Sequence, residues 1–185
     1  MGRRAPAIAA VVGVAVLALV AVFAFSPQRQ ESDPGRELIG QLAPALAGDT
    51  MDGEQFDIDD HRGEWVLVNF FATWCPPCVK EHPELISFSE RNAGSVQVVS
   101  VAFDESALRD AERFFAEKGG DWPVITSETR RASLDYRVKK LPESFLVDPS
   151  GVVVEKINGG VTAAQLESTI AQHARASAEG AEGGS

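Results

Sequence analysis

Hydrophobic residues in this chain gather in short continuous runs separated by stretches of helical character. The runs Trp65–Phe71 and Val96–Ala102 contain no charged residue, as expected for strands buried on both faces of a sheet. Helices are predicted from Pro76 to about Arg91 and over Ala107–Lys118, and a short strand over Gln55–Ile58. These elements predict strands that alternate with helices.

The last third of the chain carries the pattern of a β-hairpin. Two apolar segments, Phe145–Val147 and Val152–Val154, flank the turn sequence Asp148–Gly151. Pro149 presets φ at the second turn position, and Gly151 can adopt positive φ without steric cost. We therefore expect two antiparallel strands here.

A final helix is predicted to follow the hairpin. Thr162 and Gln165 have the spacing of a capping box, so the helix is expected to begin there and to continue to about Arg175. The order is then a β-α-β-α-β series followed by a hairpin and a helix. This order predicts the α/β class, with a central mixed β-sheet flanked by helices.

The N-terminal region has the features of a membrane anchor. Ala7–Phe25 is an uncharged apolar stretch of 19 residues, close to the ~20 that a spanning helix needs. Arg3 and Arg4 favour a cytoplasmic N-terminus, which would place the remainder outside the cytoplasm. A cleaved signal peptide is the alternative, but the end of the run lacks a convincing small-x-small cleavage site, and Pro27 is unfavourable there.

Composition shifts along the chain predict four parts. Residues 26–43 are polar and contain Pro34 and Gly35, as in a tether, whereas residues 177–185 are rich in Ala, Gly, Glu and Ser. The predicted parts are a transmembrane signal anchor at 1–25, a polar linker at 26–43, a folded domain at 44–176 and a disordered tail at 177–185.

The charge of the chain limits its partners. Acidic residues number 27 and all lie after position 25, whereas two of the 17 basic residues, Arg3 and Arg4, precede it. The remainder therefore carries a formal net charge of −12. We expect no nucleic-acid partner, because such a partner requires a basic surface. Neutral or basic proteins or peptides fit better, although the charge could serve solubility alone.

Two cysteines are too few for a disulfide scaffold or a four-cysteine zinc site. A bond between residues separated by only two positions also constrains the unfolded chain little. The pair is therefore predicted to be reactive rather than structural. We expect no metal and no cofactor, and a monomeric chain.

The segment Trp74–Cys78 lies where a buried strand is predicted to give way to a helix. A helix start presents unpaired N–H groups and a partial positive charge, which stabilise a thiolate and lower the pKa of Cys75. Cys75 is expected to be exposed and nucleophilic, with Pro76 at the first helical position. Cys78, in the first turn, can attack a mixed disulfide formed on Cys75.

The sequence around this motif resembles the thioredoxins. Val66–Cys78 is similar to their active-site strand and helix start, and Pro83 matches the proline that kinks the following helix. Leu141–Asp148 is similar to their cis-proline strand. The resemblance implies a thioredoxin fold in which the Pro142 peptide bond is cis and Pro142 faces Cys75.

The resemblance is sharpest to the membrane-anchored, extracytoplasmic TlpA/ResA/CcmG (DsbE) group, over roughly residues 40–175. It rests on the anchor, on the added segment that includes Ala107–Lys118, and on Glu81 with the string Pro142–Asp148. Membership implies a thiol:disulfide oxidoreductase.

One position departs from ordinary thioredoxins. Those proteins keep a buried aspartate six residues before the first cysteine, and this chain has Asn69 there. Asparagine cannot accept the proton of a buried thiol. Glu81, three residues beyond Cys78 on the same helical face, is predicted to do so, as the matching glutamate of the TlpA-like group implies. A solvated surface carboxylate is the alternative.

Several further residues are expected to contact the substrate. Simple packing is an alternative for Trp74, and an exposed charge is an alternative for Glu143. The predicted substrate-binding residues are Trp74, Pro76, Leu141, Pro142 and Glu143.

The resemblance implies a function in cytochrome c maturation. The expected activity is reduction of apocytochrome c disulfides by the extracytoplasmic domain of a single-pass membrane protein, with a membrane dithiol donor of the CcdA/DsbD type. A broad TlpA-like reductase for clients such as copper-site assembly proteins, or a disulfide-forming oxidase, is an alternative. A Cu(I) metallochaperone is a further alternative, but its distal ligand would have to come from scattered histidines or from Met1 or Met51, the only methionines.

Overall fold

The computed structural model describes residues 13, 15, 16, 18–21 and 33–182. The chain divides into two compact units, Met1–Ser32 and Asp33–Ser185. The described residues of the first unit are helical, and the predicted anchor lies mostly outside them. Within the described part of the chain, no helix combines the length and the apolar character needed to cross a membrane.

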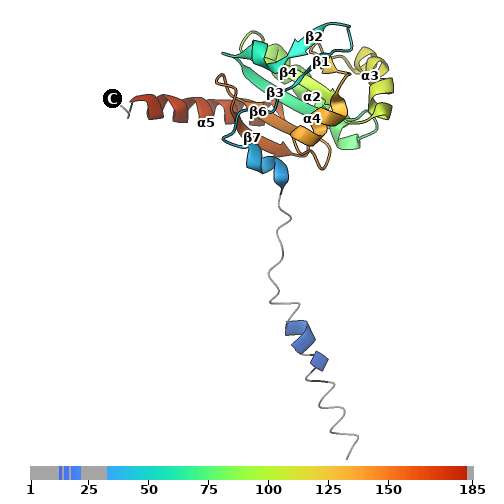
Figure 1. Cartoon of the computed structure of the whole chain (residues 1–185), viewed down its shortest axis with the longest axis vertical. Helices are drawn as coiled ribbons and strands as arrows, with labels where there is room; N and C mark the ends of the chain where they lie inside the picture. The colour runs from blue at the N-terminus through green and yellow to red at the C-terminus, as the bar shows by residue number, and fades with distance from the viewer. Residues whose placement is uncertain (1–12, 14, 17, 22–32, 183–185) are drawn as a thin grey trace, which may run out of the picture. The chain divides into compact units, whose positions relative to one another are not determined.

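The second unit is built around a mixed sheet of five strands (Figure 1). Strands β3 and β4, and β4 and β5, are parallel, whereas β6 pairs antiparallel with both β3 and β7. The strands in spatial order are β5 (Val124–Ile125), β4 (Val96–Ala102), β3 (Trp65–Phe71), β6 (Glu143–Val147) and β7 (Val153–Asn158). A second, two-stranded antiparallel sheet pairs β1 (Ala47–Asp49) with β2 (Gln55–Asp57).

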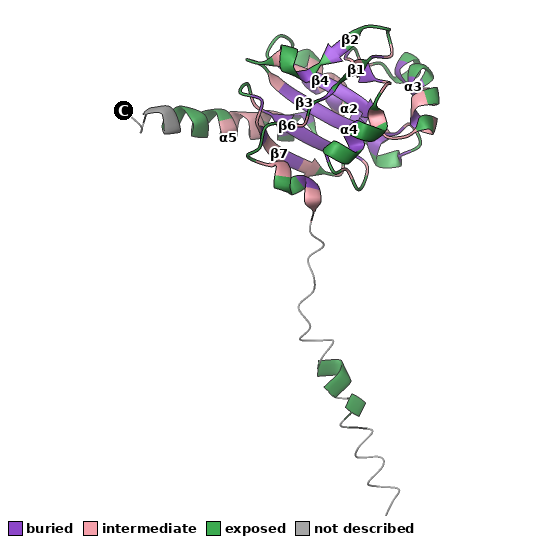
Figure 2. Ribbon diagram, viewed as in Figure 1, coloured by how far each residue is buried: buried purple, intermediate pink, exposed green. Residues whose placement is uncertain are grey.

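Helices cover both faces of the sheet. The α-helices are α2 (Pro76–Arg91), α3 (Glu105–Lys118), α4 (Thr129–Asp135) and α5 (Ala163–Glu182), and the 3-10 helices are η1 (Pro34–Leu38) and η2 (Ile58–His61). Helices α2, α3 and α5 contribute to one hydrophobic cluster, and α4 and η1 contribute to the other. Figure 2 shows the central strands almost entirely buried.

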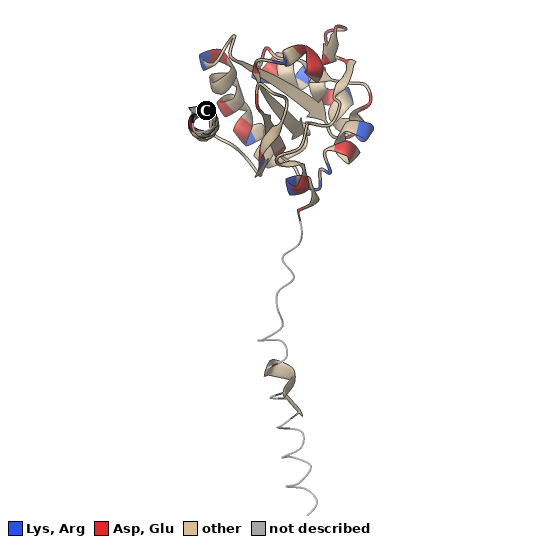
Figure 3. Cartoon of the chain, turned by 60° about the vertical axis from the view of Figure 1, so that its left-hand side comes forward, with Lys and Arg blue, Asp and Glu red and all other residues tan. Residues whose placement is uncertain are grey.

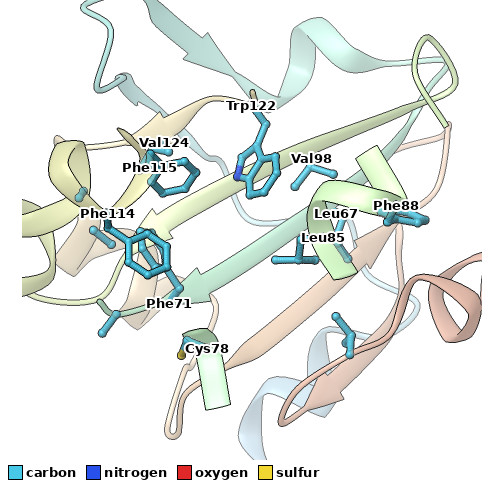
Figure 4. Packing of buried hydrophobic residues seen from close by; sticks show 14 of the residues in the cluster. Leu67, Phe71, Cys78, Leu85, Phe88, Val98, Phe114, Phe115, Trp122 and Val124 are labelled. Carbon is cyan, nitrogen blue, oxygen red and sulfur yellow. The ribbon is translucent and has the colours of Figure 1, made fainter. Parts of the chain in front are cut away.

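Side chains along β3 point alternately to the two faces of the sheet and so contribute to both clusters. Leu67 and Phe71 belong to the cluster under α2 and α3, whereas Val66, Val68 and Phe70 belong to the opposite one. Figure 4 shows the first cluster, with Cys78 at its edge below Phe71, and with Trp122 and Phe115 together on the far side of the cluster. Charged residues lie mainly on helices and loops, and the sheet is largely free of them (Figure 3). The disulfide motif therefore sits at the margin of a well-packed core.

The predicted long elements are confirmed. Strands β3 and β4 and helix α2 have the predicted bounds, and Gly151 has φ of 85° in the hairpin turn. The predicted strand over Gln55–Ile58 ends at Asp57, because the chain turns there into η2. No residues were predicted for helix α4 or for β5, which is the last strand of the predicted β-α-β-α-β series, since seven and two residues respectively are too short for a periodic pattern.

The predicted linker and tail differ from the structure. The second compact unit begins at Asp33, inside the segment assigned to the linker, because Leu38, Ile39 and Ala43 pack against the sheet. Helix α5 continues to Glu182 rather than ending near Arg175, since the alanine-rich sequence there favours helix. Residues 26–32 and 183–185 of these two predicted parts lie outside the described residues.

The predicted capping box is present at the start of α5. The Gln165 N–H donates to Thr162 Oγ1 at 3.2 Å, and the Thr162 N–H donates to Gln165 Oε1 at 3.0 Å. Thr162→Ala should therefore lower the free energy of unfolding by about 1 kcal/mol, measured by urea denaturation. Thr169→Ala, inside the same helix, is the control and should be neutral or slightly stabilising. Equal unfolding midpoints for wild type and Thr162→Ala would contradict this role.

Candidate active site

The two cysteines form a disulfide at the start of α2, and three residues separate the end of β3 from Cys75. Their Cα atoms are 5.3 Å apart. Cys75 is the N-cap residue of the helix, and its Sγ accepts a hydrogen bond from the Cys78 N–H at 3.3 Å. Cys75 therefore lies at the N-terminus of the helix that follows β3, as the sequence predicted.

The exposure of Cys75 differs from the prediction. Cys75 is only 3% exposed, so the expectation of an exposed sulfur was wrong for the disulfide state. The reason is that an N-cap side chain turns back toward the helix amides. The neighbouring Trp74, 56% exposed, and both intervening prolines lie on the surface instead.

The two prolines change the electrostatics of this helix start. A helix normally offers its first N–H groups to a nearby anion, but Pro76 and Pro77 have none. The Cys78 N–H is thus the donor that the structure places on Cys75 Sγ. A Cys75 thiolate should gain less stabilisation here than at a helix start with all its donors.

Glu81 lies in a buried hydrogen-bond network behind the disulfide. Its Oε1 accepts from Asn69 Nδ2 at 3.0 Å, and its Oε2 accepts from the Val161 N–H at 3.0 Å. Asn69 Nδ2 also donates to Ser144 Oγ at 3.1 Å. Because Cys78 and Glu81 are three residues apart on α2, they lie on the same side of the helix. Glu81 is 3% exposed, which excludes the alternative of a solvated surface carboxylate.

Burial gives this carboxyl an unusual proton affinity. Desolvation raises the pKa of Glu81 from 4.5 to about 7, although the hydrogen bonds from Asn69 and Val161 oppose the rise. A group with such a pKa can accept and release a proton near neutral pH.

Glu81 also lines a surface groove of about 590 Å³, together with Pro76, Pro77, Lys80, Glu84 and Gly160–Thr162. The buried carboxyl therefore lies at the boundary between interior and solvent.

The predicted cis-proline strand is present. The Leu141–Pro142 peptide bond is cis, as the resemblance implied. Pro142 is buried at the start of β6, and Leu141 is partly buried against both hydrophobic clusters.

Glu143 differs from its predicted role in the substrate groove. It is 2% exposed, and its Oε2 lies 2.9 Å from Nζ of the buried Lys156. The side chain points into the protein because β6 alternates faces, with Ser144 on the side of Glu81. In this geometry the Glu143 carboxylate is an internal ion-pair partner and does not line a groove.

Comparison with known proteins identifies the family of this chain. The model of the family described as Redoxin matches residues 38–172. The chain belongs to the Redoxin family.

Several relatives of this Redoxin protein are named thiol–disulfide oxidoreductases. Thiol-disulfide oxidoreductase ResA of Bacillus thuringiensis (strain Al Hakam) is 32% identical over 137 residues, 74% of this chain and 79% of that protein. ResA of Bacillus subtilis (strain 168) is 31% identical over 135 residues, 71% of this chain and 75% of that protein. A Chlorobium tepidum structure described as a thiol:disulfide interchange protein DsbE has a TM-score of 0.65 and 30% identity, covering 72% of this chain and 96% of that one.

The similarity to these proteins and the presence of the cysteine pair show what class of enzyme this is. The Redoxin protein is a thiol–disulfide oxidoreductase of the ResA/DsbE type with a thioredoxin-like fold. Among residues 33–182 and the few described before them, no three His, Cys, Asp or Glu side chains are placed to share a metal ion.

Some residues of the site were not predicted from sequence. Ser144 and Val161 come from β6 and from the loop before α5, and only the tertiary fold brings them to Glu81. Asp104 was also missed. Its Oδ1 accepts a hydrogen bond of 3.4 Å from the Trp74 indole Nε1–H, so the loop before α3 helps to hold the exposed tryptophan beside the disulfide.

Proposed function

We propose that this Redoxin protein reduces disulfides of client proteins outside the cytoplasm, and that its client is apocytochrome c during cytochrome c maturation. The observation that carries the proposal is Glu81, a buried carboxyl with a pKa of about 7, one helical turn beyond the resolving cysteine. The choice of client rests on the resemblance to the TlpA/ResA/CcmG group.

The direction of electron flow follows from the stability of the reduced state. A disulfide is strongly oxidising when its reduced thiolate form is stabilised. Here Pro76 and Pro77 remove two backbone donors, and the negative charge of ionised Glu81 further disfavours a thiolate. Both effects disfavour the reduced pair, so the dithiol should give up its electrons readily. This argument favours a reductase over a disulfide-forming oxidase.

The proposed reaction has two exchange steps. The Cys75 thiolate attacks one sulfur of the client disulfide, forming a mixed disulfide and releasing the first client sulfur as a thiolate, which is then protonated. Glu81 accepts the proton of the Cys78 thiol, and the resulting thiolate attacks Cys75 Sγ. The second client sulfur leaves as a thiolate and takes up the proton held by Glu81, which returns to its ionised form, and two electrons have passed from the cysteine pair to the client.

Client binding is proposed at the surface around the disulfide. Trp74 offers an exposed aromatic face there, and Pro76 lies beside it. An extended client segment would pair with the backbone next to Leu141 and Pro142 as an added strand.

The proposed setting is the outer side of a membrane. The apolar stretch Ala7–Phe25 would act as a single-pass anchor, with Arg3 and Arg4 on the cytoplasmic side. Because each cycle oxidises Cys75 and Cys78, a membrane dithiol donor of the CcdA/DsbD type would have to regenerate the reduced pair.

Client choice can be tested with oxidised peptides. The reduced protein should reduce a disulfide peptide with the haem-attachment sequence C-x-x-C-H about 10-fold faster than a peptide of the same composition in scrambled order. Equal rates would contradict apocytochrome c as the preferred client. Faster reduction of a copper-site assembly protein would indicate the broader TlpA-like function, and net disulfide formation in a reduced client would contradict the direction.

A further inference from the structure

The loop that precedes Pro142 is held from inside the protein. Glu143 folds its carboxylate back toward this loop, where Oε1 accepts the Lys140 N–H at 3.1 Å and the Lys139 N–H at 3.4 Å. The Lys139 N–H is also 3.4 Å from Oε2. One carboxylate therefore binds two successive backbone amides of the segment that leads to Pro142, beside which client pairing is proposed.

A buried cation fixes this carboxylate. Nζ of Lys156, whose side chain is fully buried, lies 2.9 Å from Glu143 Oε2 and 5.4 Å from the centre of the Phe145 ring. Strands β6 and β7 pair Glu143 with Asn158 and Phe145 with Lys156, so these side chains share one face of the sheet. This is the face opposite Glu81.

The segment that begins at Asp33 and includes η1, here called the N-terminal strap, closes the outer side of the ion pair. Asp33 Oδ1 pairs with Lys156 Nζ, and Asp33 Oδ2 accepts from Asn158 Nδ2 at 2.8 Å. The strap packs closely against Lys156 at Gly35, where an added Cβ would lie 2.5 Å from Lys156 Nζ. The buried cation is thus compensated by two carboxylates, one from β6 and one from the strap.

We propose that Glu143 is a positioning residue for client binding, which acts by holding the Lys139–Pro142 loop through the buried Asp33–Lys156–Glu143 ion network. The inference rests on the proposed pairing of a client segment beside Pro142. An ordered loop presents its backbone to the client in one shape, which reduces the entropy lost on binding. Because Glu143 faces away from Glu81 and the disulfide, it leaves the sulfur chemistry unchanged.

The proposal predicts a separation of binding from chemistry. Glu143→Gln replaces a charged acceptor by a weaker neutral one and should raise KM for an extended disulfide peptide about 10-fold. Its kcat, the reduction potential of Cys75–Cys78 and the rate with the small disulfide of oxidised glutathione should stay unchanged. Glu155→Gln, on the same strand as Lys156, is the matched control and should leave every value unchanged.

A second variant and a direct measurement guard against a folding defect. Glu143→Gln combined with Lys156→Gln removes both charges of the pair, so no cation is left buried without a carboxylate on β6. It should raise KM in the same way. Hydrogen exchange should show faster exchange of the Lys139 and Lys140 amides in both variants, with the amides of β3 unchanged.

The outcomes distinguish this inference from the proposed client. Because the test uses a generic extended peptide, it remains valid if apocytochrome c is not the client. An unchanged KM with unchanged exchange at Lys139 and Lys140 would overturn the positioning role. An equal loss with the peptide and with oxidised glutathione, or a shifted reduction potential, would also overturn it, because Glu143 would then act on the sulfurs.

Discussion

Cys78→Ala is expected to stop turnover and to leave the client covalently attached to Cys75. The remaining thiol can still attack a client disulfide, but without Cys78 nothing in the site resolves the mixed disulfide. Non-reducing electrophoresis and mass spectrometry should therefore show a stable one-to-one adduct with the C-x-x-C-H peptide. Steady-state reduction should be abolished.

The reciprocal variant is the control for this experiment. Cys75→Ala should give neither turnover nor an adduct, because Cys78 lies inside the first turn of α2, behind the N-cap position that Cys75 occupies. A stable adduct with Cys75→Ala and none with Cys78→Ala would reverse the assigned roles of the two cysteines.

Glu81→Gln should slow resolution of the mixed disulfide by about 100-fold at pH 7, the scale of a lost general base. In the wild type, the rate of resolution should rise with pH through about 7, because Glu81 accepts the Cys78 proton only when it is ionised. The variant should lack this inflection. Rapid-mixing measurement of peptide release between pH 5 and 9 tests both expectations.

The same substitution should change the pH dependence of stability. Because the pKa of Glu81 is raised from 4.5 to about 7, folding favours the protonated carboxyl, and its contribution is complete below pH 4.5. As pH rises from 4.5 to 7 the unfolded chain ionises first, so the oxidised protein should lose on the order of 3 kcal/mol. Glu81→Gln should remove this slope in urea unfolding.

Glu84→Gln is the matched control for Glu81. Glu84 lies on the same helix and lines the same groove, but its Oε2 accepts the Ala163 N–H at 3.0 Å. Glutamine can keep that bond, so the control should preserve both the pH–rate profile and the stability profile. Identical pH–rate profiles for Glu81→Gln and wild type would remove Glu81 from the proton transfer.

Local sequence patterns were sufficient for much of the fold. Strand β3 is a continuous run without charged residues, helix α2 is long, and the cysteine motif marks their junction. The capping box at Thr162 was equally readable, because its partners are three residues apart. Strand β5 and helix α4 are too short to give a sequence pattern. Strand β5 is defined by its pairing with β4 rather than by the sequence.

The candidate site was predictable only where its chemistry is local. Cys75, Cys78 and Glu81 lie three residues apart, at the N-cap and in the first two turns of α2, so their spacing carries the signal. The interactions of Glu143 could not be read in this way, because its partner Lys156 is on another strand and Asp33 belongs to the N-terminal strap. From the sequence alone, Glu143 could lie either on the surface or in a buried ion pair.

The most direct test of the central claim is alkylation of the reduced protein by iodoacetamide, resolved residue by residue by mass spectrometry between pH 5 and 9. Pro76 and Pro77 remove two donors from the helix terminus, but the Cys78 N–H still favours ionisation of Cys75 over Cys78. Cys75 should therefore be modified first and near neutral pH, with Cys78 following much more slowly. Preferential modification of Cys78, or no modification of either thiol near neutrality, would contradict a thiol–disulfide exchange mechanism that begins at Cys75.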